Sequence, residues 1–308
     1  MDLRQLRYFE VLATQRHYGR ASTILHVAQP ALSRQIRLLE GELGVRLFER
    51  HARGATPTDE ALFLLERASF LLRYAAQMKQ DMMLRQRDPR GTVAIGLSPG
   101  LAQQLAVPLT RAVQHLFPEV RLRIVEGFAP SLHSMLMKGG VDLAVLNGPV
   151  QRSNLSTMPL LTEEICLIGR PQDKPLRARK IKLARLAGLP LVITGLAKSG
   201  VRLELEAAAA RAGVVLNQVV EVETVEVAKR LVLDGVEFTV HFAAAIKNDI
   251  DAGALRAVPI EGLKLRRVLA RASDRPPSKA TEAVMATLRG VVEESVQSGT
   301  WQNATLDR

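Results

Sequence analysis

The sequence contains a single cysteine, Cys166, among its 308 residues. One cysteine excludes an internal disulfide framework and every zinc or iron–sulfur site that needs several thiolates. Because Cys166 stands in the apolar stretch 165–168, we predict a buried structural thiol rather than a reactive one. The six histidines lack a metal-binding spacing such as HExxH, and the GxGxxG, P-loop and GxSxG motifs are missing. We therefore expect no metal, no cofactor and no catalytic residue, and predict that the protein is not an enzyme.

Long apolar runs are missing as well. The first ten residues carry no apolar signal core, and no uninterrupted apolar run is long enough to span a bilayer. The sequence therefore predicts a cytoplasmic protein without a membrane partner. Hydrophobic residues still make up 47% of the chain, which is enough for packed cores in two domains. The net charge of +11 favours an acidic polymer or an anionic surface as partner, although an evenly basic surface gives the same total.

Two short helices are expected near the start of the sequence. Asp2 and Gln5 have the spacing of a capping box, in which each side chain bonds the other residue's backbone amide, so a helix begins there. A second helix is expected over 19–25, followed by a tight connector over 26–29. The residues that this second helix should bury are Ala21, Ile24 and Leu25.

A third helix is predicted from Pro30 to the residue before Gly44. Pro30 suits the first helical position because that amide has no partner within a helix, and Gly44 is a natural terminator. Four apolar residues at helical spacing predict one buried face, namely Leu32, Ile36, Leu39 and Leu43. Because the opposite face is basic, the second and third helices together describe a helix-turn-helix over about residues 18–37.

Two short strands and a long helix are expected next. Residues 46–58 predict a small wing around a turn at 51–54, and the segment 59–87 contains neither glycine nor proline. Its apolar stripe is too long for an ordinary packed helix, so a second copy of the same helix is the simplest partner. The predicted dimerisation residues are Leu65, Ala68, Leu72 and Ala75. Residues 88–91, Asp-Pro-Arg-Gly, then predict a hinge.

Beyond residue 91 strands alternate with helices, which is typical of parallel α/β sheets. The expected strands cover residues 92–97, 121–125, 141–146, 189–193, 219–222 and 238–241. The expected helices cover residues 101–116, 131–138, 202–212 and 225–233.

The amino-terminal residues resemble the winged helix-turn-helix of LysR-type transcriptional regulators. The resemblance rests on Arg20-Ala21-Ser22, on the run from Leu25 to Ile36 (LHVAQPALSRQI), on Leu39-Glu40 and on the run from Leu43 to Arg50 (LGVRLFER). It covers about sixty residues, and the remainder agrees with that family in order and length. Residues 121–127 and 142–144 further resemble the branch that includes nitrogen-assimilation control regulators.

The resemblance implies an α/β protein of three parts. These are a winged helix-turn-helix DNA-binding domain over 1–58, a linker and dimerisation helix over 59–90, and an effector-binding domain over 91–308. The last resembles periplasmic solute-binding proteins, with one lobe at 91–164 and 267–308 and another at 165–266. The segment 234–242 departs from the family pattern at a strand that should border the cleft between these lobes.

The exposed face of the third helix is expected to read DNA in the major groove. Gln29 can bond adenine, Ala31 can contact a thymine methyl group, and Arg34 can bind a guanine or a phosphate. Arg37, Arg50 and Arg53 are better suited to neutralising phosphates, which adds affinity but little sequence information. The predicted DNA-binding residues are Ser22, Gln29, Pro30, Ala31, Ser33, Arg34, Arg37, Arg50 and Arg53.

The effector is expected where strands lead into helices. Ligands of parallel α/β sheets bind beyond the carboxyl ends of the strands, where helix amino termini offer amides to an anion. Each serine at such a junction is equally well explained as a helix cap, and Asn147 as a turn residue. The predicted effector-binding residues are Ser98, Gly100, Ser131, Asn147, Thr194, Ser199 and Thr239.

These features together predict a sequence-specific transcriptional regulator that is controlled by a small effector, such as an anion, bound between the two lobes. The resemblance implies a dimer or tetramer on double-stranded DNA at an interrupted dyad, with RNA polymerase as a further partner. One alternative is a regulator that acts through oligomer contacts without any ligand. The other is a solute-binding protein, which fits residues 91–308 but not the segment before them.

Overall fold

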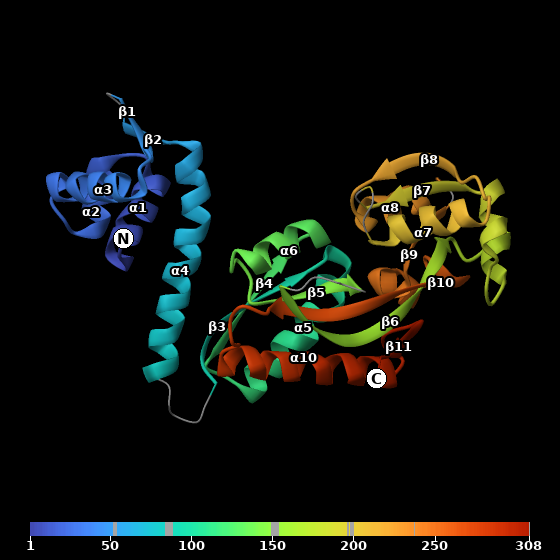
Figure 1. Ribbon diagram of the computed structural model, residues 1–308. Coiled ribbons are helices and arrows are strands. Elements are labelled where there is room, and N and C mark those ends of the chain that lie inside the picture. Colours follow the sequence, from blue (N-terminus) through green and yellow to red (C-terminus); the bar gives the residue numbers. More distant parts are fainter. Residues whose placement is uncertain are drawn as a thin grey trace. The chain divides into compact units, whose positions relative to one another are not determined.

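The computed structural model describes residues 1–51, 54–83, 89–148, 154–195, 197, 200–236 and 238–307 (Figure 1). These residues form two compact units, one built mainly from the chain before residue 88 and the other mainly from the chain after it. Among the described helices, none is long and apolar enough to cross a membrane.

The first unit is a winged helix-turn-helix followed by a long helix. In chain order its elements are α1 (Leu3–Gln15), α2 (Tyr18–Leu25), α3 (Gln29–Leu43), β1 (Phe48–His51), β2 (Gly54–Pro57) and α4 (Asp59–Met83). The two strands form the antiparallel wing that the sequence predicts. The fully buried side chains of the shared core include Phe9, Leu12, Leu32, Ile36, Leu39 and Leu47.

Local signals set the helix starts. The capping box is confirmed, since the Gln5 amide donates to Asp2 Oδ1 at 2.7 Å and the Asp2 amide donates to Gln5 Oε1 at 3.0 Å. α2 begins one residue earlier than predicted because the His17 side chain caps it. α3 begins at Gln29, which places Pro30 at the second helical position. Proline lacks a backbone N–H group, and this costs nothing at the second position either, because the first four N–H groups of a helix have no partner within it.

Two residues that were expected in the core are exposed. Ile24 is 51% exposed, because α2 turns Ala21 and Ser22 toward the core instead. Leu43 is 37% exposed, because it is the last residue of α3 and Gly44 turns the chain away at φ 70°.

The apolar stripe of α4 packs against its own chain. Ala68 is fully buried in the core of the winged unit, and Leu65 and Leu72 pack against the same core. The prediction that this stripe faces a second copy is therefore wrong for these three residues. Ala75, which lies about two turns beyond Ala68, is half-buried. An apolar stripe shows that a helix needs a partner, but not which helix provides it.

The second unit is an α/β domain around a nine-stranded sheet with the order β4-β3-β5-β10-β6-β9-β7-β8, and β11 pairs with β6. Its strands are β3 (Gly91–Leu97), β4 (Val120–Glu126), β5 (Leu143–Gly148), β6 (Leu155–Gly169), β7 (Pro190–Thr194), β8 (Asn217–Val222), β9 (Phe238–Phe242), β10 (Arg256–Ala272) and β11 (Ala304–Leu306). Its helices are α5 (Pro99–Leu116), α6 (Ala129–Met137), α7 (Gly200–Arg211), α8 (Val225–Leu233), α9 (Lys247–Asp251) and α10 (Lys279–Gln297). Three short 3-10 helices complete it: η1 (Lys174–Arg177), η2 (Leu183–Gly188) and η3 (Ala243–Ile246).

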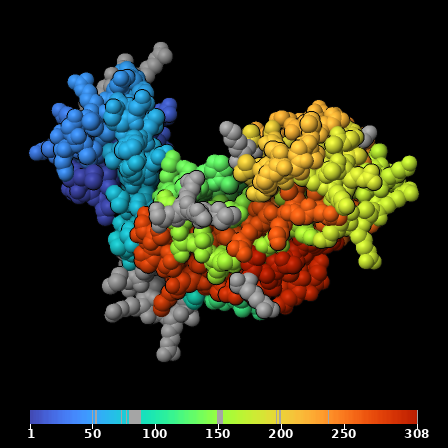
Figure 2. Space-filling model, turned by 45° about the vertical axis from the view of Figure 1, so that its right-hand side comes forward, coloured from blue at the N-terminus to red at the C-terminus, as the bar shows by residue number. Residues whose placement is uncertain are grey.

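Two lobes share this sheet. Strands β3, β4 and β5 are parallel in one lobe, β7, β8 and β9 are parallel in the other, and the long antiparallel pair β6 and β10 runs through both. In the first lobe α5 and α10 cover one face of the sheet and α6 covers the other (Figure 1). Figure 2 shows red residues from the end of the sequence packed beside green ones, while yellow residues form the second lobe. The chain therefore builds the first lobe from two separate segments.

The predicted alternation is confirmed, because every strand and helix expected beyond residue 91 overlaps an observed one. Cys166 is fully buried as predicted, and burial raises the pKa of its thiol to about 12. The sequence did not reveal β6, β10 or α10. β6 carries Glu163 and Glu164 in its middle, and β10 changes register between Pro259 and Lys264, so neither strand shows a simple alternation of apolar and polar residues.

Candidate DNA-contacting surface and effector pocket

One face of α3 stays outside the core of the winged unit. Six of the predicted DNA contacts lie on this helix, namely Gln29, Pro30, Ala31, Ser33, Arg34 and Arg37. All are exposed except Ser33, which is half-buried. Arg37 Nε donates to the backbone oxygen of Ser33 at 3.5 Å, so this side chain lies back along the helix. A helix with its polar face exposed and its apolar face fixed can enter the major groove.

The other predicted DNA contacts have different outcomes. Ser22 is only 8% exposed and its hydroxyl donates to the backbone oxygen of Gly19 at 2.9 Å, so it stabilises α2 and does not face outward. This corrects its assignment to the DNA surface. Arg50 stands in β1 opposite Ala55, although its side chain is outside the described part of the chain. Arg53 lies outside the described residues altogether.

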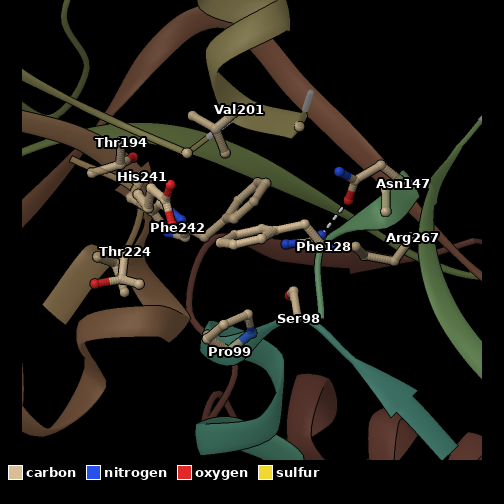
Figure 3. Close-up of a pocket in the computed structure, with 16 residues that line it drawn as sticks. Ser98, Pro99, Phe128, Asn147, Thr194, Val201, Thr224, His241, Phe242 and Arg267 are labelled. Atoms are coloured by element: carbon tan, nitrogen blue, oxygen red, sulfur yellow. Dashed lines mark hydrogen bonds between the residues drawn. The ribbon is translucent and has the colours of Figure 1, made fainter. Parts of the chain in front are cut away.

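A pocket lies between the two lobes of the second unit. Its volume is about 80 Å³, several times what one ordered water requires. Residues from both lobes and from β10 line it, as Figure 3 shows. The lining residues are Ser98, Pro99, Gly100, Phe128, Ala129, Asn147, Thr194, Gly195, Gly200, Val201, Glu223, Thr224, Val225, His241, Phe242 and Arg267.

The structure brings four of the predicted effector residues to this pocket, namely Ser98, Gly100, Asn147 and Thr194. Ser131 is exposed and does not line the pocket. Thr239 is fully buried and its hydroxyl donates to the backbone oxygen of Val192 at 2.8 Å, so it joins β9 to β7 instead. These two assignments are corrected, because a residue near a strand end does not have to point into the cleft. Ser199 lies outside the described residues.

Among the described residues that line the pocket, Arg267 is the one lysine or arginine. Its side chain is 7% exposed, and its Nε donates to Glu163 Oε2 at 2.6 Å. One terminal nitrogen, Nη1, donates to Asn147 Oδ1, and the centre of the guanidinium lies 4.2 Å from the ring centre of Phe242. Glu163 also accepts a hydrogen bond from the indole of Trp301 at 2.8 Å. Three neighbours therefore fix Arg267 in place without covering its charge completely.

His241 lies across the pocket from Asn147 (Figure 3). Its Nδ1 atom is buried, and no residue in the described part of the chain bonds it. Burial and the nearby charge of Arg267 lower the pKa of His241 to about 3. The imidazole is therefore neutral at neutral pH, and it offers a ligand a hydrogen bond without adding charge.

Four helices begin at the pocket wall. The first residues of α5, α6, α7 and α8 are among the lining residues, so the partial positive charges of four helix amino termini converge on it. Ser98 and Thr224 occupy the capping positions of α5 and α8, yet neither side chain caps its helix. Both residues line the pocket, and they come from opposite lobes. Gly100 allows the start of α5 to lie close to η3, because a Cβ at this position would lie 3.1 Å from the Cβ of Ala245.

The sequence reasoning missed Arg267, His241 and Thr224. Arg267 does have a signal, since Leu263 and Leu265 are buried and alternation along a strand places residue 267 on their face. An arginine at such a position is a buried charge, which requires a partner. His241 and Phe242 fall in the segment that departs from the family pattern, and that departure marks the pocket lining.

Comparison with protein families gives two matches. Residues 3–62 match the family described as bacterial regulatory helix-turn-helix protein, lysR family. Residues 86–293 match the family described as LysR substrate binding domain. The second match begins at residue 86, next to the division between the two compact units at Arg87 and Asp88.

The chain is also similar to individual proteins. It is 36% identical over 170 residues to the nitrogen assimilation regulatory protein nac of Klebsiella aerogenes, which covers 55% of this chain and 56% of that protein. It therefore spans little more than half the length of that relative. The nac protein of Escherichia coli (strain K12) is 29% identical over 309 residues, which covers 98% of this chain and 99% of that protein. A full-length variant of OxyR from Pseudomonas aeruginosa has the same fold, with a TM-score of 0.73, 22% identity and coverage of 100% and 99% of the two chains.

Proposed function

The chain belongs to the LysR family of DNA-binding transcriptional regulators, and we propose that a small anion bound between its lobes controls its activity on DNA. The observation that carries this proposal is the pocket in which Arg267 and four helix amino termini meet. Since its target is DNA, we place the protein in the cytoplasm, with RNA polymerase as its partner at the promoter.

We propose that α3 and the wing make the DNA contact. The exposed residues Gln29, Ala31 and Arg34 lie at the amino-terminal half of α3, which is the part of a recognition helix that reaches base edges. Arg37 lies one turn further along, where it suits a phosphate. The dependence of binding on DNA sequence should therefore come from Gln29, Ala31 and Arg34. Its dependence on salt concentration should come from Arg37.

Effector control follows from the position of the pocket between two lobes. A ligand that contacts both lobes stabilises the arrangement in which its contacts are complete, and only this difference in affinity shifts the population. The test is a thermal-shift screen of the full chain, in which a bound ligand raises the melting temperature by mass action. Ser98→Ala and Thr224→Ala should each weaken the response, whereas the matched control Ser131→Ala should not. Equal responses in all three variants would place the ligand elsewhere.

We propose that self-association uses the face of α4 opposite to its buried stripe. This face carries Phe63 and Met78, which are 61% and 49% exposed. The rings of Phe70 and Tyr74 stack on the same face with centroids 6.0 Å apart. Residues at this spacing share one side of a helix, and an exposed apolar stripe of this kind favours pairing with a second helix. A dimer of this type would present two copies of α3 to an interrupted dyad, and pairing of dimers would give a tetramer.

A further inference from the structure

We propose that Arg267 selects the effector, that this effector is a small monocarboxylate, and that its binding is transmitted to Glu163 and Trp301. This inference rests on the proposed effector control, and it adds the chemical class of the ligand and the residue that recognises it.

The guanidinium of Arg267 is only partly used by the protein. Nε donates to Glu163 at 2.6 Å and Nη1 donates to Asn147, while the ring of Phe242 lies against its face. No described residue makes a hydrogen bond to the second terminal nitrogen, Nη2, and Arg267 lines the pocket. A guanidinium held in this way is preorganised, so a ligand that binds it does not have to order the side chain first. Carboxylates and phosphates are the small anions whose geometry matches its planar donors.

The charges around the pocket limit the ligand to one negative charge. Arg267 is the only lysine or arginine among the lining residues of the described chain, and the carboxylate of Glu163 already neutralises much of its charge. Glu223 at the lining is exposed and would repel a second anionic group. The helix amino termini each add only a partial positive charge. A monoanion is therefore favoured over a dianion such as sulfate or succinate.

The remaining lining residues describe the uncharged part of the ligand. Phe128, Phe242, Val201 and Val225 supply apolar contacts, and the volume of about 80 Å³ suits a short or planar body. The buried Nδ1 of His241 and the non-capping hydroxyls of Ser98 and Thr224 can bond a hydroxyl or carbonyl group on it. The ligand class is thus a short monocarboxylate, aliphatic or aromatic, with room for one additional polar group.

The fluorescence of Trp301 should report the binding of a ligand to Arg267. It is the only tryptophan in the sequence, it is 3% exposed, and its indole donates to the same carboxylate that holds Arg267. A ligand carboxylate that binds Arg267 draws the guanidinium toward itself and weakens its bond to Glu163. Glu163 holds the guanidinium through Oε2 and the indole through Oε1, so a weaker bond to Arg267 leaves more negative charge on the carboxylate and strengthens its bond to the indole. Binding should therefore change the emission of Trp301, although no ligand atom touches the indole.

The experiment titrates the full-length protein with acetate, lactate, butyrate and benzoate, and with the neutral amide of each acid. Sulfate and succinate represent dianions. Melting temperature and Trp301 emission are followed together. At least one monocarboxylate should raise the melting temperature and change the emission along one saturation curve, while its amide binds at least tenfold more weakly. The dianions should bind more weakly than the best monocarboxylate.

Variants then assign the binding to Arg267. Arg267→Lys keeps the positive charge but loses the planar fork, and it should weaken binding of the best acid at least tenfold. Since a single neutral substitution would leave Glu163 unpaired, the neutral variant is the double replacement Arg267→Gln with Glu163→Gln, which should abolish selection of acid over amide. The matched control is Arg266→Gln. Arg266 directly precedes Arg267 on β10, and its side chain is 53% exposed and pairs with Asp307 on the opposite face of the strand. Its replacement should therefore leave binding of the acid unchanged.

Each contrary outcome removes a different part of the proposal. If the amides bind as well as the acids, the ligand class is wrong but effector control remains. If Arg267→Lys and the double variant bind like the parent, Arg267 does not select the ligand. If a monocarboxylate binds without changing Trp301 emission, the transmission to Glu163 is wrong. If no acid in the panel binds, both the monocarboxylate and the anionic effector are overturned, whereas the DNA-binding function is judged separately by its own assays.

Discussion

Glu40 on α3 is joined to the first residues of the wing, where its Oε1 accepts backbone hydrogen bonds from Leu47 at 2.8 Å and from Phe48 at 3.2 Å. The carboxylate therefore fixes the wing relative to the recognition helix. Both amides stand at the entrance to β1, so the position of the wing depends on a single side chain of α3.

Glu40→Ala should destabilise the winged unit by about 1–3 kcal/mol, because it removes the acceptor of two partly buried amides. Thermal unfolding of the parent and the variant measures the difference. The control is Glu42→Ala, since Glu42 is exposed and pairs with the terminal amino group of Met1, a contact that is worth about 0–1 kcal/mol. Equal losses in the two variants would show that the hydrogen bonds to the wing carry little stability.

Arg34→Ala should reduce discrimination between the specific site and random DNA. A bidentate contact between an arginine and a base contributes about 1–3 kcal/mol of discrimination, and Arg34 is the exposed arginine nearest to the amino terminus of α3. Arg37→Ala should instead weaken binding to all sequences alike and reduce the magnitude of the salt slope by about 1. Titrations on both kinds of DNA at several salt concentrations separate these effects. Identical behaviour of the two variants would contradict the assignment.

Phe63→Glu should weaken self-association without lowering the melting temperature of the winged unit, because Phe63 is 61% exposed and contacts the solvent-facing Arg67. Sedimentation velocity gives the oligomeric state. Leu72→Asp is the informative counterpart, since Leu72 packs against the core of its own chain and the new charge should destabilise that core. A Phe63→Glu variant that remains fully associated would remove this face of α4 from the interface.

His241 should make the second unit sensitive to acid. Its pKa is lowered from the ordinary value of 6.5 to about 3, so between these values the unfolded chain binds a proton that the folded chain does not. The free energy of unfolding therefore falls as the pH falls below 6.5, by about 2 kcal/mol at pH 5. His241→Gln should remove this loss, so its stability relative to the parent should improve from pH 7 to pH 5.

Urea unfolding followed through Trp301 emission measures this difference, because the only tryptophan lies in the second unit. His115→Gln is the control for the loss of an imidazole, since His115 is exposed at the end of α5. A constant difference between parent and His241→Gln at the two pH values would mean that the imidazole is not held neutral in the folded chain.

The elements of the first unit could be read from the sequence because their signals are local. The capping pair of Asp2 and Gln5, the position of Gly44 and the spacing of the buried residues all act within a few positions along the chain. The same holds for the alternation of strands and helices beyond residue 91. Errors arose at Ile24 and Leu43, where the pattern was apolar but the neighbouring helix did not reach the side chain.

Amino-acid sequence alone thus determined the helix-turn-helix, the wing, the two-lobed α/β domain and the family to which the chain belongs. Tertiary structure decided which surfaces meet. It packed the stripe of α4 against the core that α1 helps to form, turned Thr239 into the sheet, and brought Glu163 to Arg267, which is 104 positions away. Burial of an apolar stripe is equally favourable against any apolar partner, and a buried charge can be paired from any strand that passes it. The partner of a buried stripe or a buried charge depends on the path of the whole chain, so a local pattern in the sequence does not predict it.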